Sequence, residues 1–355
     1  MDLNQRISAF AKVGKFLGQF SDKNHSSDPS LPFPNSFYEE MNHILHRAKA
    51  ENGWFTLPNV YHSLKSWSKE LREENLQQWL SNYTIPASAT PKTVAIVMAG
   101  NIPLVGFHDF LSVLMAGHKV IAKLSSNDAV LLPFIKKLLV HAEQEFESKI
   151  RLTDEKLENF DAVIATGSNN TARYFDHYFG KYPHIIRKNR NSVAVLTGNE
   201  SKGQLEGLAD DIFQYFGLGC RNVSKLFVPE GYDFKAFFEA LYTWKDIINN
   251  HKYINNYDYN KAVYLMGSHE LLDNEFLLLK KDEGYASPIG VLFYETYTNE
   301  AQLAERLKAE DEQIQAIISE ASIKNATPLG TAQAPALDQY ADGVDTMAFL
   351  LKLYE

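Results

Sequence analysis

The sequence contains a single cysteine among its 355 residues, which excludes an internal disulfide. No pair of histidines stands with a carboxylate or thiol at the spacing of a zinc site, so we predict no metal. Basic residues are also scarce relative to acidic ones: 35 Lys and Arg stand against 44 Asp and Glu, giving a net charge of −9. Because a nucleic-acid-binding surface requires the opposite balance, we expect small-molecule partners and no nucleic acid.

Long apolar runs are absent as well. No stretch approaches the roughly 20 apolar residues that cross a bilayer. Residues 1–20 are amphipathic and lack the pattern of a cleaved signal. We therefore expect no membrane insertion and a cytoplasmic location. A hydrophobic content of 45% with 22% charged residues is typical of a globular protein, and the length suits two domains.

The first 90 residues have a helical and irregular pattern. Apolar periodicity predicts helices near 3–20, 36–51 and 59–81, and a Ser/Asp/Pro-rich loop separates the first two at 22–36. We predict that residues 1–90 form a helical segment that packs on the domain that follows.

From Thr93 the pattern changes to short β-branched runs that alternate with helical periodicity. The predicted strands of this region lie at 94–100, 119–125, 161–168 and 192–198. Between the first two, one helical face carries Leu104, Phe107, His108, Leu111 and Met115, as the crossover between parallel strands requires. The predicted fold is α/β, with a doubly wound nucleotide-binding domain over 91–214.

A second α/β domain is predicted over 215–330. Its strand candidates are 224–230, 262–267 and 290–297, and the Asn/Tyr-rich stretch 253–260 is predicted to be a polar loop. The remaining residues, 331–355, form a C-terminal segment that is free to return to the first domain.

Three predicted strands of the first domain end in small or polar residues at the start of a helix. These are the segments 99–101, 125–127 and 166–169. Ligands of open α/β sheets bind in this crevice, where helix N-termini favour a phosphate. The alternative is that these residues only make turns and N-caps. No G-x-G-x-x-G follows a strand; Gly217-Leu218-Gly219 follows a helix and lacks the third glycine.

Cys220 has a more informative setting. An apolar helical stripe beginning at Leu205 is ended by Gly217, which places the thiol on a flexible, Gly-flanked turn just past the helix. Most single cysteines are buried small hydrophobes, and that interpretation stays open. The following Arg221 is either a cation that lowers the thiol pKa or a solvated surface residue.

Four segments resemble, in order, motifs of the aldehyde dehydrogenase superfamily, and more closely its LuxC-type acyl-CoA reductase branch. Residues 101–103 resemble the family's Asn-Phe-Pro turn, and 116–126 resemble its Ala-Gly-Asn…Lys-Pro-Ser-Glu strand. Residues 165–168, with Arg173 following, resemble its Phe-Thr-Gly-Ser…Arg turn, and 217–220 stand where the family has Gly-Gln-x-Cys. The resemblance covers roughly residues 91–300, and it implies an aldehyde-dehydrogenase-like fold with a second, thiol-bearing domain.

The resemblance also implies a role for each matched residue. Cys220 is the nucleophile, and the Asn101 amide stabilises the oxyanion. Ser126 replaces an acid that would repel a 2′-phosphate, so the implied cofactor is NADPH, with NADH also open. The implied cofactor-binding residues are Lys123, Ser125 and Ser126 on the adenosine side and Thr166, Gly167 and Ser168 at the pyrophosphate.

Two departures from the family bear on the reaction. The family's general-base glutamate aligns near Ile186, so water has no evident activator. The glutamate that holds the nicotinamide ribose survives only in residues 283–288, where Glu283 is one position out of register. The chain is also short for the long arms through which these dehydrogenases exchange strands, which leaves a homo-oligomer open.

We therefore predict an NAD(P)H-dependent reduction of an acyl-CoA, or another acyl thioester, to an aldehyde through an acyl-cysteine. The basic stretch 187–190 either meets a cofactor phosphate or is a solvated loop. Three alternatives remain: an oxidative aldehyde dehydrogenase, a cofactor-independent cysteine acyltransferase or thioesterase, and a non-catalytic nucleotide-binding subunit.

Overall fold

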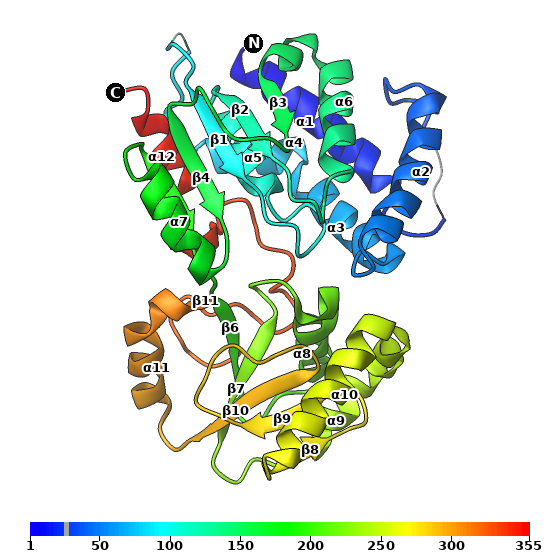
Figure 1. Ribbon diagram of the computed structural model, residues 1–355, viewed down its shortest axis with the longest axis vertical. Helices are drawn as coiled ribbons and strands as arrows, with labels where there is room; N and C mark the ends of the chain where they lie inside the picture. Colours follow the sequence, from blue (N-terminus) through cyan, green and yellow to red (C-terminus); the bar gives the residue numbers. More distant parts are fainter. Residues whose placement is uncertain (25–27, 88) are drawn as a thin grey trace. The chain divides into compact units, whose positions relative to one another are not determined.

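The computed structural model describes residues 1–24, 28–87 and 89–355, which divide into two units (Figure 1). The first unit comprises residues 1–188 and 336–355, and the second comprises residues 189–335. Among the described residues, no helix is long and apolar enough to cross a membrane.

A five-stranded parallel sheet forms the centre of the first unit, in the order β3-β2-β1-β4-β5. Its strands are rich in β-branched and small residues because both faces are covered. Val94 and Ile96 face one core, whereas Ala95 faces the other. The strands are β1 (Thr93–Val97), β2 (Lys119–Lys123), β3 (Ile150–Thr153), β4 (Ala162–Thr166) and β5 (His184–Arg187).

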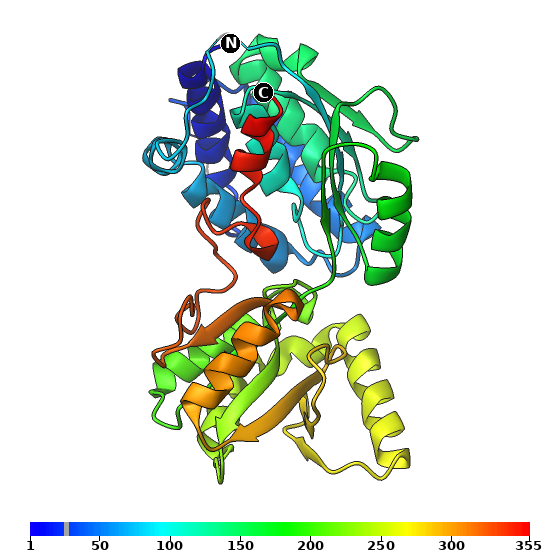
Figure 2. The same cartoon turned by 90° about the vertical axis from the view of Figure 1, so that its left-hand side faces the viewer.

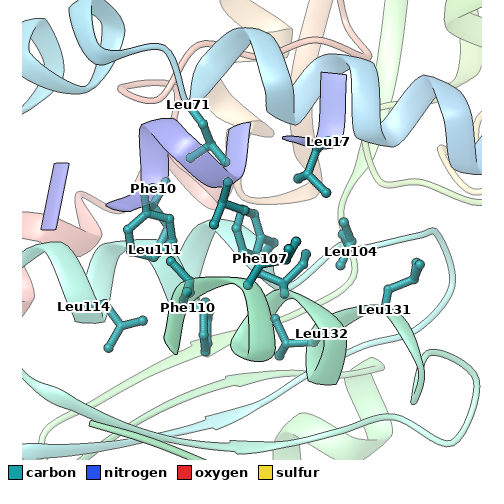
Figure 3. Close-up of a cluster of buried hydrophobic side chains, with 14 of the residues drawn as sticks. Phe10, Leu17, Leu71, Leu104, Phe107, Phe110, Leu111, Leu114, Leu131 and Leu132 are labelled. Atoms are coloured by element: carbon teal, nitrogen blue, oxygen red, sulfur yellow. The ribbon is translucent and has the colours of Figure 1, made fainter. Parts of the chain in front are cut away.

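Helices cover both faces of this sheet. One face carries the larger core, to which α1, α5, α6 and α12 contribute and part of which Figure 3 shows. The other face is covered by α7, through Phe175 and Phe179. Figure 2 shows α12, in red, beside the helices of the first unit. The bounds are α1 (Leu3–Gly18), α5 (Phe107–Met115), α6 (Leu131–Ala142), η1 (Gln144–Ser148), α7 (Asn169–Phe179), η5 (Ala341–Gly343) and α12 (Thr346–Lys352).

The N-terminal segment adds three more helices, which are α2 (Asn35–Glu51), α3 (Leu57–Glu70) and α4 (Glu73–Leu80). The single helix predicted over 59–81 is therefore wrong in one respect. Leu71 leaves the helical conformation and Arg72 is extended, so the chain starts a new helix at Glu73. Leu71 and Leu76 remain in the core on either side of this break.

The second unit contains a six-stranded sheet in the order β11-β6-β7-β10-β9-β8, parallel except for β8. Its strands are β6 (Asn191–Val195), β7 (Val223–Pro229), β8 (Leu271–Asp273), β9 (Leu278–Lys281), β10 (Val291–Tyr297) and β11 (Ile314–Ser319). The helices are α8 (Lys202–Phe213), η2 (Gln214–Gly217), α9 (Lys235–Leu241), η3 (Tyr242–Asn249), α10 (His251–Met266), α11 (Glu300–Ala309) and η4 (Asp311–Gln313).

Two predictions for this region are wrong. The sequence predicts residues 192–198 as a strand of the first domain, but β6 pairs with β7 and β11, so residues 189–214 belong to the second unit. The polar loop at 253–260 and the strand at 262–267 are one helix, α10. Asn250 caps this helix, and Tyr253 and Tyr257 bury their rings one turn apart.

Candidate active site

The predicted cofactor residues of the first unit lie at one edge of its sheet. The parallel strands β1, β2 and β4 end at Val97, Lys123 and Thr166, so the loops that follow them share the carboxyl edge. The chain runs outward from β1 through β2 to β3, and then returns to place β4 on the other side of β1. This reversal is the topological switch point at which open α/β sheets bind ligands.

The loop after β1 carries Asn101, whose side chain is exposed. Two hydrogen bonds fix the loop just beyond it. The hydroxyl of Ser63 donates to the carbonyl of Pro103 across 2.9 Å. The N–H of Leu104, whose φ of 60° is left-handed, donates to Oδ2 of Asp128 across 2.8 Å. The backbone that presents Asn101 is therefore held by side chains from two other segments.

Asp128 is unusual for a carboxyl group at a sheet edge. Its Oδ1 is buried and has no hydrogen-bond partner in the part of the chain that the structure describes. Burial raises the pKa of Asp128 to about 7, against which the N–H groups of Leu104 and Leu131 act. Neither Asp128 nor Ser63 was predicted, because each acts on a segment distant from it along the chain.

The last residue of β2 and the residues that follow it offer ammonium and hydroxyl groups. Lys123 donates from Nζ to the carbonyl of Glu155 across 3.0 Å, and Oγ of Ser125 accepts from the N–H of Asn127 across 3.2 Å. The exposed Ser126 follows. A Cβ on Gly100 would lie 2.5 Å from Oγ of Ser125, so glycine lets the loops after β1 and β2 touch.

The residues after β4 begin a helix. Ser168 is the N-cap of α7, and its Oγ accepts from the N–H of Thr171 across 3.2 Å. Gly167 donates its N–H to the carbonyl of Arg187 across 3.3 Å. The structure thus brings Thr166, Gly167 and Ser168 to the switch point with a helix N-terminus, which is a favourable setting for a phosphate.

Cys220 lies in the second unit, on an exposed turn between α8 and β7. Helix α8 ends at Phe213. The sequence predicts a later end, at Gly217. Three consecutive residues then have left-handed φ angles, Tyr215 at 55°, Phe216 at 59° and Gly217 at 76°. Left-handed non-glycine residues store strain and gather at functional sites. This strain was not visible in the sequence, where two aromatic residues continue the helical stripe.

Asn222 holds this turn in place. The side chain is buried, and its Nδ2 donates to the carbonyls of Asp211 at 3.0 Å and Gln214 at 2.8 Å, at the end of α8. Its Oδ1 accepts from the N–H of Gly219 at 2.8 Å. Ser192 adds a hydrogen bond of 2.9 Å to the carbonyl of Cys220. The turn is therefore fastened at several points, and the prediction of a flexible turn is wrong.

Glu283 lies in the same unit, exposed, in the loop after β9. That loop is fastened on both sides of Glu283. Buried Lys225 donates to the carbonyl of Asp282 at 2.5 Å, and the hydroxyl of Ser224 donates to the carbonyl of Tyr285 at 2.7 Å. Lys225 and Ser224 are on β7, the strand that follows Cys220.

The two arginines of the basic stretch 187–190 make structural contacts, whereas Lys188 and Asn189 between them are exposed. Arg187 is buried and forms an ion pair with Asp109 at 2.7 Å, and it also donates to the Thr346 hydroxyl at 2.9 Å. Arg190 donates to the carbonyl of Asp311 at 3.0 Å. Both guanidinium groups serve structural contacts within their own units.

Comparison with solved structures identifies the fold. Aldehyde dehydrogenase 21 from Physcomitrella patens matches with a TM-score of 0.68 at 12% identity, over 99% of this chain and 84% of its own. The aldehyde dehydrogenase KauB from Pseudomonas aeruginosa matches with a TM-score of 0.62 at 14% identity, over 95% and 75%. An NAD-dependent benzaldehyde dehydrogenase from Corynebacterium glutamicum matches at 0.61 and 12%, over 91% and 77%. The fold is that of the aldehyde dehydrogenases.

The family is more specific than the fold. The model of the acyl-CoA reductase (LuxC) family matches residues 20–244, well over half of the chain, and the chain belongs to this family. It is therefore an oxidoreductase that acts on aldehyde or acyl groups. No curated protein matches the chain in sequence. The matched region includes Asn101 and Cys220, and it begins within the N-terminal helical segment, upstream of the motifs that carried the resemblance.

Proposed function

We propose that the protein reduces an acyl-CoA to an aldehyde through an acyl group carried on Cys220, with NADPH as the preferred reductant and NADH as an alternative. The observation that carries the proposal is the turn of Cys220. The exposed residue Cys220 stands on a turn that follows three left-handed residues, and Asn222 and Ser192 fasten this turn. Packing alone requires neither the exposure nor the strain, whereas an aligned nucleophile requires a fixed backbone.

In the first half-reaction the Cys220 thiolate attacks the thioester carbonyl. The Asn101 amide and the N–H of Cys220 donate to the developing oxyanion. The oxyanion then collapses, the carbon–sulfur bond to coenzyme A breaks, and the released thiolate takes up a proton. The acyl group is left as a thioester of Cys220.

In the second half-reaction the bound nicotinamide supplies a hydride, which is the only chemistry asked of the cofactor. The acyl carbon of the Cys220 thioester accepts this hydride, and the same two donors hold the resulting oxyanion. Collapse of that thiohemiacetal breaks the bond to sulfur, releases the aldehyde and restores the thiolate of Cys220. The net reaction consumes one proton, and the thiol of coenzyme A carries it.

The fate of the acyl-cysteine depends on water. Residues 184–192 contain no carboxylate, and the guanidinium of Arg187 in this segment is buried in its ion pair. Without a general base, attack of water on the acyl-cysteine is slow. This favours reduction over both the oxidative dehydrogenase and the thioesterase.

The carboxyl edge of the first sheet suits the proposed cofactor. The donor set at the end of β2 comprises the Lys123 ammonium and the hydroxyls of Ser125 and Ser126, and residues 124–127 contain no carboxylate that would repel a 2′-phosphate. The N-terminus of α7 at Ser168 would hold the pyrophosphate. We propose Glu283 as a ligand of the nicotinamide ribose.

A direct test is to incubate the protein with acyl-CoAs of several chain lengths and either NADPH or NADH. Cofactor absorbance and aldehyde formation are both followed. We expect equal amounts of cofactor consumed and aldehyde formed, with a lower KM for NADPH, and no activity in Cys220→Ala. Full activity in that variant, or free acid as the product, would overturn the proposal.

A further inference from the structure

A pocket opens at the amino edge of the first sheet, the edge opposite to Asn101. Its charged and polar side chains come from α1, from the turn before β2, from the residue before β3 and from the chain after α12: Arg6, His118, Lys149 and Tyr354. Met1 also lines it, and its amino group is paired with Glu145. No role in the proposed reaction falls on these residues. We propose that this pocket binds a phosphate dianion between Arg6 and Lys149.

Arg6 is the feature that points to an anion. The residue is only 8% exposed, and its Nε has no hydrogen-bond partner in the described part of the chain. Buried guanidinium groups in proteins are paired with an acceptor, because an unpaired buried charge is costly. Because Arg6 lines the pocket, an anion bound there would supply an acceptor for this guanidinium.

Gly117 makes room for this guanidinium. A Cβ on Gly117 would lie 2.6 Å from Nη1 of Arg6 and 3.1 Å from the hydroxyl of Tyr354. The φ of Gly117 is also left-handed, at 94°. Glycine at this turn therefore permits the approach of Arg6 to the pocket wall, which any larger residue would close.

A second cation faces the same pocket. Burial, together with the nearby charges of Lys119 and Arg6, holds the pKa of the Lys149 ammonium below its usual range, while Glu145 acts against them. The two nearby carboxylates have other partners. Oδ1 of Asp2 accepts from the N–H of Gln5 at 2.9 Å, and Glu145 pairs with the Met1 amino group at 2.7 Å.

The wall of the pocket is neutral. His118 accepts from the N–H of Lys92 at Nδ1, across 3.1 Å, and donates from Nε2 to the carbonyl of Leu350, across 2.9 Å. Both nitrogens are thus committed and the ring is uncharged. Tyr354 stacks on this ring at 4.3 Å and donates its hydroxyl to the carbonyl of Ala116.

Besides the Met1 amino group, which is paired with Glu145, the pocket has two cationic side chains, and these determine which ligand fits. Arg6 offers parallel N–H donors, and Lys149 offers an ammonium on the other side, which together match a tetrahedral dianion better than a monovalent carboxylate. Either free orthophosphate or the phosphate of a small monoester has this chemistry. The lining of the pocket explains why a phosphate group would bind. The experiment below determines what, if anything, is attached to that phosphate.

The test is a thermal-shift titration of the full chain with orthophosphate at constant ionic strength, and a parallel titration with methyl phosphate. We compare the unaltered protein with Arg6→Met and Lys149→Gln. The matched control is Lys15→Gln, which changes an exposed lysine on α1, the helix that carries Arg6.

We expect saturating phosphate to raise the Tm of the unaltered protein and of Lys15→Gln by about 2–4 °C. Lys149→Gln should lose most of this rise, and Arg6→Met should lose all of it. Without phosphate, Arg6→Met should be at least as stable as the unaltered protein, because it removes an unpaired buried charge. If Arg6→Met does not fold, the proposal is judged by Lys149→Gln alone, which should lose most of the phosphate-induced rise in Tm.

The comparison of ligands identifies the source of the phosphate. A response to orthophosphate alone assigns the pocket to the free ion, and a stronger response to methyl phosphate assigns it to a monoester. Equal shifts in all variants, or no shift in the unaltered protein, would overturn the proposal.

Discussion

The N–H of Leu104 donates to Oδ2 of Asp128 across 2.8 Å, and this hydrogen bond ties the left-handed backbone next to Asn101 to a buried carboxyl group. Burial raises the pKa of that carboxyl to about 7, well above its usual value of 3.8. The loop that presents the proposed oxyanion donor therefore depends on a group that titrates near neutrality.

The raised pKa of Asp128 predicts that stability falls as the pH rises. The folded state favours the protonated carboxyl, so its contribution is complete below pH 4 and is lost as the pH increases towards 7. Asp128→Asn keeps an acceptor for Leu104 and cannot ionise. Relative to the unaltered protein, the variant should gain about 2–4 kcal/mol of unfolding free energy between pH 4 and 8.

Urea unfolding across this pH range measures the difference. The matched control is Asp211→Asn, since burial also raises the pKa of Asp211 to about 7, in the second unit. The control should change the same slope without affecting the loop of Asn101. An unchanged slope in Asp128→Asn would contradict the assignment.

Asn222 should matter for both stability and rate. Asn222→Ala leaves carbonyls at the end of α8 and the N–H of Gly219 without their partner, which should cost about 2–3 kcal/mol. A misplaced thiol should lower kcat about 100-fold with little change in KM. Asn256→Ala is the control, because its single hydrogen bond is exposed on α10. A variant with normal kcat would show that the turn of Cys220 needs no such support.

Asn101→Ala should lose catalysis and keep its fold. The side chain is exposed, so the unfolding free energy should change little, whereas loss of one oxyanion donor typically lowers kcat by about 100- to 1,000-fold. Asn82→Ala, another exposed asparagine of the same unit, should behave as the unaltered protein. Steady-state kinetics with an acyl-CoA measure the effect, and a rise in KM with unchanged kcat would point to substrate binding instead.

The buried pair of Arg187 and Asp109 should support the fold of the first unit. Asp109→Asn or Arg187→Met alone should cost about 3–5 kcal/mol, because each leaves an unpaired buried charge or donor. The double variant should cost less than the sum of the two. Denaturant unfolding of all three variants completes the cycle. Additive losses would show that the pair is not coupled.

The sequence was most informative where its patterns are local. Strands β1, β2 and β4 and helix α5 follow from β-branched runs and one apolar helical face, and these elements position the loops of Asn101 and Ser168. The resemblance to the family supplied the chemistry at those loops. The family match confirms that resemblance, whereas the individual site residues remain predictions.

The wrong predictions concern segments whose secondary structure or strand pairing is determined by tertiary contacts. Residues 253–266 read as a polar loop and a strand, but Tyr253 and Tyr257 form one buried face of a helix with their hydroxyls bonded to neighbours. Strand β6 resembles those of the first sheet and pairs in the second. The hydrogen bonds that Asp128 and Asn222 make to other segments were not predicted either. The spacing of residues along the chain does not show which backbone groups a polar side chain will contact.

The most direct test of the account is to mix the protein with an acyl-CoA in the absence of any nicotinamide and to follow Cys220 by mass spectrometry. We predict that Cys220 gains one acyl group, that the acyl-enzyme persists in water, and that added NADPH discharges it as aldehyde. Free acid formed without cofactor, or an acyl group on a residue other than Cys220, would contradict it.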